Sequence, residues 1–325
     1  MMKSVQFKAA GEPAEVLEVV EIPIPDAGAG EIRIKVLARN INPSDIMFVR
    51  GLYGIMPQYP SSAGFEAVGT VDANGEGVDM EVGTRVIFSA VGTWQEFVVV
   101  PAKTVIPAPV HMPDEVACQA FVNPFTAYAM VQESGLQAGQ YLLITAGGSA
   151  FGKMVLSVCK KKGIHTICTV RRDDQKGALK ALGATEVVNT ETEKLAKRVH
   201  EISQGKGADC CFDAVGGKLG AQALNSLAYK GTMYVFGLLS LENIPLNSGI
   251  MIFKSLVVKG FWLSDWMANL TKERRMEAVK EVLTMLTTAE MPADVEARYT
   301  LDEVKKAVVH ADAPGRTGKI ILVNN

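Results

Sequence analysis

The sequence lacks an apolar run of membrane-spanning length. No stretch approaches the roughly 18 consecutive apolar residues of a transmembrane helix, although 48% of the 325 residues are hydrophobic. The N-terminus passes directly into a strand-like segment, Ser4 to Ala9, without the pattern of a signal or transit peptide. We therefore expect a soluble cytoplasmic protein with no membrane partner.

An excess of charge of either sign is also absent. Lysine and arginine number 33 and aspartate and glutamate 35, which gives a formal net charge of -2. The longest basic run, Lys160 to Lys162, is typical of a solvated helix end. We expect no nucleic-acid partner, because such proteins carry a basic patch or stripe.

Cysteine and histidine are scarce, which bears on metal and redox chemistry. The five cysteines begin only at Cys118, and their odd number and apolar surroundings predict buried free thiols in a reducing compartment. The closely spaced cysteines of a structural zinc lobe are missing, and no two of the four histidines are spaced as a ligand pair. We expect no bound metal.

The length and the order of the patterns predict two domains. Up to about Gly92 the chain shows short strand patterns broken by glycine and proline, which indicate a partly open β-barrel. After Pro113, strands alternate with helices, as in a doubly wound parallel sheet. We expect an α/β protein with a barrel domain over 1–122 and 270–325 and a dinucleotide-binding domain over 123–269. The strand pattern Lys319 to Val323 predicts the return to the barrel.

The most informative stretch begins at Tyr141. An apolar run to Thr145 precedes a turn of small residues, and a helical pattern ended by Gly163 leads into a second apolar run, Ile164 to Val170. Such a unit places a helix N-terminus where it can bind a pyrophosphate. The expected phosphate-binding residues are Gly148, Ser149, Ala150, Phe151 and Gly152. A tight turn without a ligand is the alternative.

Two arginines, Arg171 and Arg172, follow the second strand of this unit. About 20 residues past the glycines, an acidic side chain binds the ribose 2′-hydroxyl of NADH, whereas an arginine accepts the 2′-phosphate of NADPH. The pair therefore favours NADPH as cofactor. A solvated helix cap, with Asp173 and Asp174 following, is the alternative.

Several separate stretches resemble one superfamily. They are Asn42-Pro43-Ser44-Asp45, Gly64-Phe65-Glu66-Ala67-Val68-Gly69, Asn123-Pro124-Phe125-Thr126-Ala127-Tyr128 and the unit from Tyr141 to Arg172. With the barrel first and the dinucleotide domain second, the whole chain resembles the medium-chain dehydrogenase/reductase superfamily. The resemblance implies a GroES-like barrel and a Rossmann domain. Zinc-dependent members need a cysteine and a histidine where this chain has Asn42 and Phe65, so a zinc-independent member is implied.

Two segments resemble the mitochondrial-type trans-2-enoyl-thioester reductases within that superfamily: Arg50-Gly51-Leu52-Tyr53 and Phe261-Trp262-Leu263-Ser264-Asp265-Trp266. The resemblance implies that Tyr53 is catalytic, because hydride delivery to an enoyl thioester leaves an enolate that needs a hydrogen-bond or proton donor. It further implies catalytic roles for Asn42 and Trp262. The alternatives are a packing aromatic for Tyr53, a loop cap for Asn42 and an apolar ridge for Trp262.

The same resemblance implies the cofactor contacts. Asn123 and Thr126 would bind its ribose or amide, and Lys319 would reach it, with a surface lysine as the alternative. The remaining expected contacts are Phe236, Gly237, Phe261, Trp262 and Leu263. Glu66 is expected to be a buried, paired carboxylate.

Three functions are compatible with these residues. The leading one is an NADPH-dependent reductase of a small-molecule trans-2-enoyl thioester, and NADPH:quinone oxidoreductases share much of the pattern. The third is a non-catalytic NADPH-binding protein with a structural or RNA-binding role. The strand patterns Thr232 to Leu239 and Leu256 to Phe261 would leave an apolar sheet edge, which predicts a homodimer.

Overall fold

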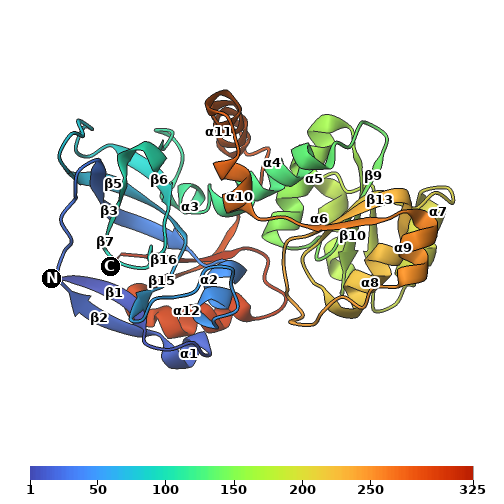
Figure 1. Cartoon of the computed structure of the whole chain (residues 1–325), viewed down its shortest axis with the longest axis horizontal. Coiled ribbons are helices and arrows are strands. Elements are labelled where there is room, and N and C mark those ends of the chain that lie inside the picture. The colour runs from blue at the N-terminus through green and yellow to red at the C-terminus, as the bar shows by residue number, and fades with distance from the viewer. Residues whose placement is uncertain (325) are drawn as a thin grey trace. The chain divides into compact units, whose positions relative to one another are not determined.

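The structure is a computed structural model that describes residues 1–324. The chain divides into two compact units (Figure 1). The first comprises Met1–Val122 and the C-terminal segment from Ala293, and the second comprises Asn123–Pro292. No helix of the described residues is long and apolar enough to cross a membrane.

The first unit is strand-rich, as expected. Its strands are β1 (Met2–Phe7), β2 (Glu18–Ile22), β3 (Glu31–Asn40), β4 (Ser61–Ser62), β5 (Glu66–Asn74), β6 (Arg85–Ser89), β7 (Phe97–Pro101), β8 (Ile106–Pro107), β15 (Val295–Thr300) and β16 (Lys319–Val323). Its helices are α1 (Pro13–Val16), α2 (Pro43–Val49), α3 (Asp114–Ala117) and α12 (Val304–Asp312). A seven-stranded sheet has the order β15-β16-β3-β5-β6-β8, with β7 also on β3, and a three-stranded sheet has the order β2-β1-β4. The predicted return of the chain is confirmed, because β16 pairs antiparallel with β3.

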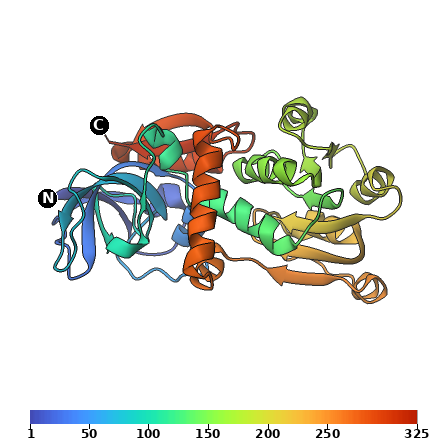
Figure 2. The same ribbon diagram turned by 90° about the horizontal axis from the view of Figure 1, so that it is seen from above.

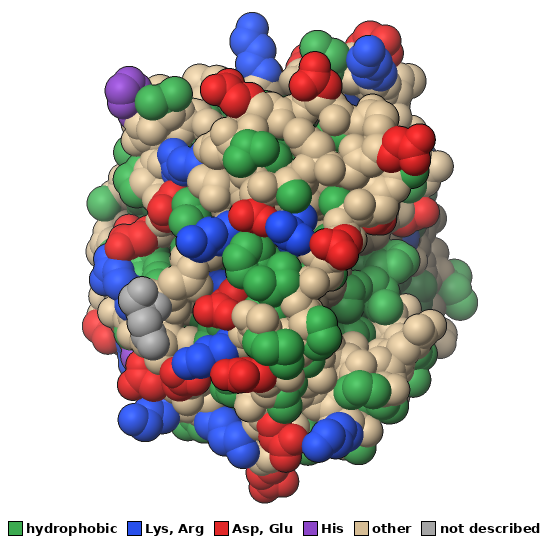
Figure 3. Space-filling view, turned by 90° about the vertical axis from the view of Figure 1, so that its left-hand side faces the viewer, with side chains coloured by type: hydrophobic (Ala, Val, Ile, Leu, Met, Phe, Trp, Pro, Cys, Tyr) green, Lys and Arg blue, Asp and Glu red, His purple; other side chains and the backbone are tan. Residues whose placement is uncertain are grey.

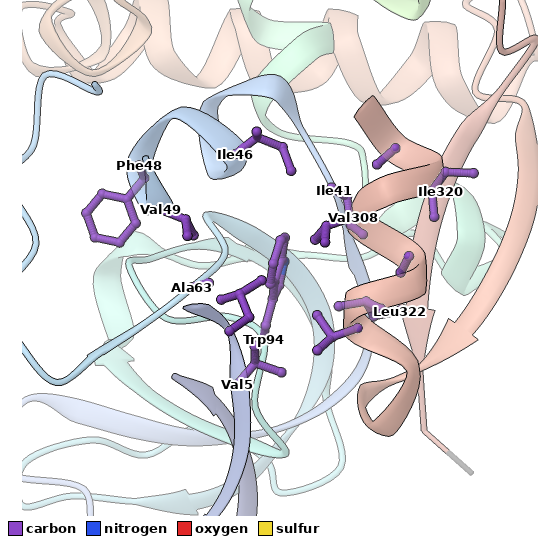
Figure 4. Packing of buried hydrophobic residues seen from close by; sticks show 14 of the residues in the cluster. Val5, Ile41, Ile46, Phe48, Val49, Ala63, Trp94, Val308, Ile320 and Leu322 are labelled. Carbon is purple, nitrogen blue, oxygen red and sulfur yellow. The ribbon is translucent and has the colours of Figure 1, made fainter. Parts of the chain in front are cut away.

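One hydrophobic cluster of this unit is centred on Trp94. Figure 4 shows the indole between side chains of α2, including Ile46 and Val49, and side chains of α12 and β16, including Val308. Its Nε1 donates to the carbonyl oxygen of Asn40 at 3.1 Å, so the buried indole is both packed and hydrogen-bonded. The cluster therefore ties the C-terminal segment to the N-terminal barrel.

The second unit alternates strands and helices. Its elements are α4 (Val122–Ser134), β9 (Tyr141–Ile144), α5 (Ala150–Lys162), β10 (His165–Val170), α6 (Lys176–Ala181), β11 (Glu186–Asn189), α7 (Leu195–Ile202), β12 (Ala208–Asp213), α8 (Gly217–Asn225), β13 (Leu227–Val235), α9 (Ser248–Lys254), β14 (Val257–Gly260), α10 (Leu263–Ala268) and α11 (Lys272–Thr287). Helices flank a six-stranded parallel sheet of order β11-β10-β9-β12-β13-β14 (Figure 1). The strand order reverses between β9 and β12, and ligands of such sheets bind at the carboxyl ends of the strands there.

The second domain boundary differs from the expectation. The first unit resumes at Ala293, whereas the sequence placed the return at residue 270. The reason is that α11 packs within the second unit, where its Glu281 contacts Tyr128 of α4 and its Arg275 donates to the carbonyl oxygen of Met267 at 2.8 Å. Figure 2 shows the long orange helix α11 crossing the green helix α4.

Local details depart from the sequence patterns in three places. The sequence of Asn40 to Val49 predicts a helix capped by Ser44 or Asp45, whereas the N-cap of α2 is Asn42, two or three residues earlier, and Asp45 accepts the amide of Asn42 at 2.6 Å. Val16 to Val20 predicts a strand, whereas Val16 ends helix α1 and β2 begins at Glu18. The patterns did not indicate several elements, most of which are short: α1, α9, α10, α12, β4, β7, β8 and β15.

The five cysteines are buried and unpaired, as expected, and burial raises the pKa of each thiol. On the face of the first unit that Figure 3 presents, lysine and arginine alternate with aspartate and glutamate. Such a mixed surface is typical of a solvated face rather than of a nucleic-acid site.

Candidate active site

The expected phosphate turn connects β9 to α5 in the second unit. Ser149 is the N-cap of α5, and its Oγ accepts the amide of Gly152 at 3.1 Å. The helix ends at Gly163, whose φ of 68° is left-handed. The cap leaves the amides of Ala150 and Phe151 in the first turn, where a helix has no carbonyl partner for them. The turn can therefore donate hydrogen bonds to an anion.

Glycine is required at two positions of this turn. A Cβ at Gly147 would lie 2.5 Å from the Cβ of Cys168, and one at Gly152 would lie 2.4 Å from the carbonyl oxygen of Gly147. Without a Cβ at these two positions, the turn can lie close to β10 and the first turn of α5 can lie close to the backbone of Gly147. The donor set and the close backbone approach fit a pyrophosphate, although the turn departs from the usual glycine spacing.

Arg171 and Arg172 lie at the same edge of the sheet as the turn, because the end of β10 bonds to it. The amide of Gly147 donates to the carbonyl oxygen of Thr169 at 2.9 Å. Both arginines are exposed, and Arg172 donates from Nε to Asp174 at 3.2 Å. Two guanidiniums beside a phosphate turn suit a 2′-phosphate, and their role stays a prediction.

Aromatic residues of the prediction meet beside this turn. Phe151 and Phe236 pack with ring centroids 4.3 Å apart. The amide of Phe261 donates to the carbonyl oxygen of Val235 at 3.0 Å, which places it at the carboxyl end of β13. Gly237 is needed there, since a Cβ would lie 2.7 Å from the carbonyl oxygen of Ala214. Residues far apart in sequence thus converge on the edge where the cofactor is expected.

The other residues expected to contact the cofactor lie at the N-terminal ends of two helices of the second unit. Trp262 is the N-cap of α10 and is 44% exposed, and Leu263 is the first residue of that helix. In α4, Asn123 is half-buried in the first turn and Thr126 is buried. The roles of these four side chains stay predictions.

A buried polar network occupies the first unit. Glu66 accepts four hydrogen bonds, from Nδ2 of Asn40 at 2.8 Å, from Nδ2 of Asn42 at 2.6 Å and from the amides of Phe121 and Val122 at 3.0 and 2.8 Å. The expectation of a buried, paired carboxylate is confirmed. The ammonium of Lys319 donates to Oδ1 of Asn42. Because Lys319 is buried, the alternative of a surface lysine is excluded.

Burial controls the protonation of this network. Removal from water lowers the pKa of Lys319 to about 8, against the opposing attraction of Glu66 and Asp45. The same effect raises the pKa of Asp45 to about 8, and the charge of Glu66 adds to it, against the hydrogen bond from the amide of Asn42. Near neutral pH the interior thus holds a protonated Asp45 and a charged Lys319.

Sequence reasoning missed Asn40 as a member of the network and treated Asp45 only as a cap. A signal for Asn40 was present, because an extended backbone places side chains two positions apart on the same side, and Asn42, which has an extended backbone just after β3, lies two positions later. No comparable signal marked Asp45, since its burial comes from the packing of α2. Asn42 is the N-cap of α2, and a cap was the alternative to a catalytic role for this residue. The catalytic role of Asn42 stays a prediction.

Tyr53 lies in the loop after α2 and is half-buried. Its ring packs on that of Phe65, with centroids 5.0 Å apart and an angle of 38° between the planes. The ring of Tyr53 thus packs on the barrel core, as expected for a packing aromatic, but the side chain is only half-buried. A packed ring and a catalytic hydroxyl are compatible in one tyrosine.

Comparison with known proteins identifies the family. The model of the alcohol dehydrogenase GroES-like domain matches residues 28–110, and that of the zinc-binding dehydrogenases matches residues 150–283. The mitochondrial enoyl-[acyl-carrier-protein] reductase of Homo sapiens is 30% identical over 320 residues, which cover 96% of this chain and 86% of the human protein. The chain belongs to the medium-chain dehydrogenase/reductase superfamily. It is an oxidoreductase with the GroES-like and Rossmann-like domains that the sequence predicted.

Other members of the medium-chain dehydrogenase/reductase superfamily point to two activities. The mitochondrial enoyl-[acyl-carrier-protein] reductase of Arabidopsis thaliana is 32% identical over 293 residues, which cover 87% of this chain and 76% of that protein. Among solved structures, the quinone oxidoreductase of Escherichia coli complexed with NADPH has a TM-score of 0.91 at 27% identity and covers 99% of both chains. That of Pseudomonas syringae has a TM-score of 0.91 at 28% identity and covers 99% of this chain and 100% of its own.

One of the two matching family models is named for zinc binding, which raises the question of a zinc site. Among residues 1–324, no three histidine, cysteine, aspartate or glutamate side chains are grouped so as to hold a metal ion. At the positions where zinc-dependent members carry ligands, Asn42 is hydrogen-bonded into the polar network and Phe65 packs against aromatic rings.

Proposed function

We propose that this protein is an NADPH-dependent reductase whose acceptor is a trans-2-enoyl thioester. The observation that carries the proposal is Tyr53, a half-buried tyrosine seated on Phe65 in the loop after α2. Full-length similarity to enoyl-[acyl-carrier-protein] reductases supports the acceptor class.

The chemistry divides between cofactor and protein. Bound NADPH would supply the hydride that adds to the β-carbon of the acceptor. The chain would hold the cofactor through the turn Gly148 to Gly152 and through Arg171 and Arg172. The hydroxyl of Tyr53 donates a hydrogen bond or a proton as the acceptor becomes an enolate, and the packed ring keeps that hydroxyl in one place.

A zinc-independent mechanism is part of the proposal. Asn42 and Phe65 stand where zinc-dependent members have ligands, and an amide that already bonds Glu66 and a phenyl ring are poor zinc ligands. Polarisation of the acceptor therefore falls to hydrogen-bond donors such as Tyr53. We also propose a cytoplasmic location, in keeping with the five buried, unpaired cysteines.

The second candidate is an NADPH:quinone oxidoreductase, which the likeness to the Escherichia coli structure favours. Quinones accept hydride readily and need no well-placed acid. The third candidate, a non-catalytic cofactor-binding protein, would bind NADPH tightly without oxidising it with either acceptor. Its RNA-binding form would need a basic face, which the mixed charges of Figure 3 do not favour.

One experiment separates these functions. NADPH oxidation is measured with crotonyl-CoA and with benzoquinone, for the protein and for Tyr53→Phe. We expect Tyr53→Phe to lower turnover of crotonyl-CoA at least about tenfold while NADPH affinity and quinone turnover stay unchanged. Unchanged crotonyl-CoA turnover would remove Tyr53 from the mechanism. Turnover of benzoquinone alone would favour the second candidate.

We further propose a homodimer. Strand β14 is an edge of the six-stranded sheet, and an open edge invites pairing with a second chain. The neighbouring helix α9 exposes Ile252 and Phe253, and Val257 of β14 is exposed as well. Pairing of two β14 edges across a twofold axis would cover these side chains.

A further inference from the structure

Five aromatic rings of the first unit form a chain that begins at Tyr53. The successive centroid distances are 5.0 Å from Tyr53 to Phe65, 5.2 Å to Phe48, 5.6 Å to Phe7 and 5.8 Å to Tyr59. Tyr53 and Tyr59 lie in the same loop, so this loop rests on one row of rings at both of its ends. Between the two tyrosines, Ile55 packs against the barrel core and Met56 is exposed.

Phe65 is the member of this chain that supports Tyr53, and its backbone is fixed on both sides. Its carbonyl oxygen accepts the amide of Ala90 at 3.1 Å, and that of Gly64 accepts the amide of Gly92 at 2.8 Å. Gly64 has a φ of 97°, and a Cβ there would lie 2.2 Å from Cδ1 of Trp94. These contacts leave the backbone at Phe65 little conformational freedom.

The side chain of Phe65 is equally constrained. It is 7% exposed and packs edge-on against Phe48 at an angle of 60°. Figure 4 shows Phe48 at the end of α2, on the side of the helix away from Val308. A ring held by a fixed backbone on one side and by a buried phenyl on the other is a rigid platform.

The tyrosine on this platform, Tyr53, lies outside any helix or strand and shares its loop with the exposed Leu52 and Met56. Packing against Phe65 restrains the plane of its ring, and the hydroxyl of a tyrosine lies in that plane. Phe65 therefore helps to set the direction of the proposed proton donor.

We propose that Phe65 is a positioning residue for Tyr53. It acts on reduction of an enoyl thioester, which uses the tyrosine hydroxyl, and leaves quinone reduction unaffected. The inference rests on the proposed function and extends it, because it assigns a role to the position where zinc-dependent relatives carry a ligand. A residue that only fills the core would influence both reductions alike.

The test compares Phe65→Leu with Phe88→Leu. Both variants replace a buried phenyl by a smaller apolar group, but Phe88 belongs to another hydrophobic cluster of the first unit, which contains neither Phe65 nor Tyr53. We expect Phe65→Leu to lower kcat with crotonyl-CoA at least about fivefold, with the KM for NADPH and benzoquinone turnover unchanged. Phe88→Leu keeps the ratio of the two activities at its original value. Phe65→Tyr, which keeps the ring, restores crotonyl-CoA turnover.

A double variant excludes an indirect effect. In the background of Tyr53→Phe, the further change Phe65→Leu should cause no additional loss of crotonyl-CoA turnover. Equal losses with both acceptors, or an equal ratio change in Phe88→Leu, would overturn the positioning role. If Phe65→Leu fails to fold, Phe65→Met carries the same comparison. No effect of Tyr53→Phe itself would instead contradict the proposed function.

Discussion

The buried ammonium of Lys319 donates a hydrogen bond to Oδ1 of Asn42, and Nδ2 of Asn42 donates to the carboxylate of Glu66. This contact joins the last strand of the chain to the start of α2. It also brings a positive charge to a carboxylate that is only 1% exposed. A buried charge is tolerated when such a partner is near, and it becomes costly when the partner is removed.

Lys319→Met should destabilise the protein by about 3 kcal/mol, because it leaves Glu66 buried without its cation. Urea unfolding at pH 7 measures the loss. Lys306→Met is the control, since the side chain of Lys306 is 76% exposed and lies 3.8 Å from Glu303, and a change within about 0.5 kcal/mol is expected. Equal losses in the two variants would contradict this account. If Lys319 also contacts the cofactor, the folded variant will bind NADPH more weakly.

Asp45→Asn should alter the pH dependence of stability. Burial raises the pKa of Asp45 to about 8, so the folded protein keeps this group protonated at pH values where the unfolded chain has lost the proton. Wild-type stability therefore falls relative to Asp45→Asn as pH rises from 5 to 7.5, by at most about 1.4 kcal/mol per pH unit. Urea unfolding across this range measures the difference, and parallel curves would show that Asp45 ionises normally in the folded protein.

Arg171→Gln should weaken NADPH binding by about tenfold and leave NADH binding unchanged, because the guanidinium is expected to pair with the 2′-phosphate. Arg172→Gln should have a smaller effect, since Arg172 already donates to Asp174. Isothermal titration with both cofactors provides the measurement. Arg198→Gln serves as control, because Arg198 pairs with Glu193 and Glu201. If NADPH and NADH binding weaken equally, neither arginine selects the cofactor.

Phe253→Glu should convert the proposed dimer into a monomer. Phe253 is 83% exposed on α9, and a charge in its place would be buried on pairing of two chains. Sedimentation velocity at micromolar concentration should give about twice 34.9 kDa for the protein and 34.9 kDa for the variant. Val110→Glu, a change at an exposed residue of the first unit, should keep the dimer. A monomeric wild-type protein would contradict the proposal.

The stretch from Tyr141 to Arg172 shows what the sequence alone determined. Its strand, turn, helix and second strand lie within a few residues of the expected bounds, because buried apolar runs, a turn of small residues and a glycine at the helix end are local signals. The return of Lys319 to Val323 to the barrel was also predictable, from the superfamily order of the domains.

Only the tertiary structure decided the contacts between distant residues. Asn40, Asp45 and Lys319 share one buried network, and the shifted pKa values of Asp45 and Lys319 follow from burial among neighbours up to 277 positions apart. The membership of α11 in the second unit likewise depends on packing against α4. The seat of Tyr53 on Phe65 is of the same kind, because a row of rings contributed by a strand, a helix and a loop leaves no local pattern in the sequence.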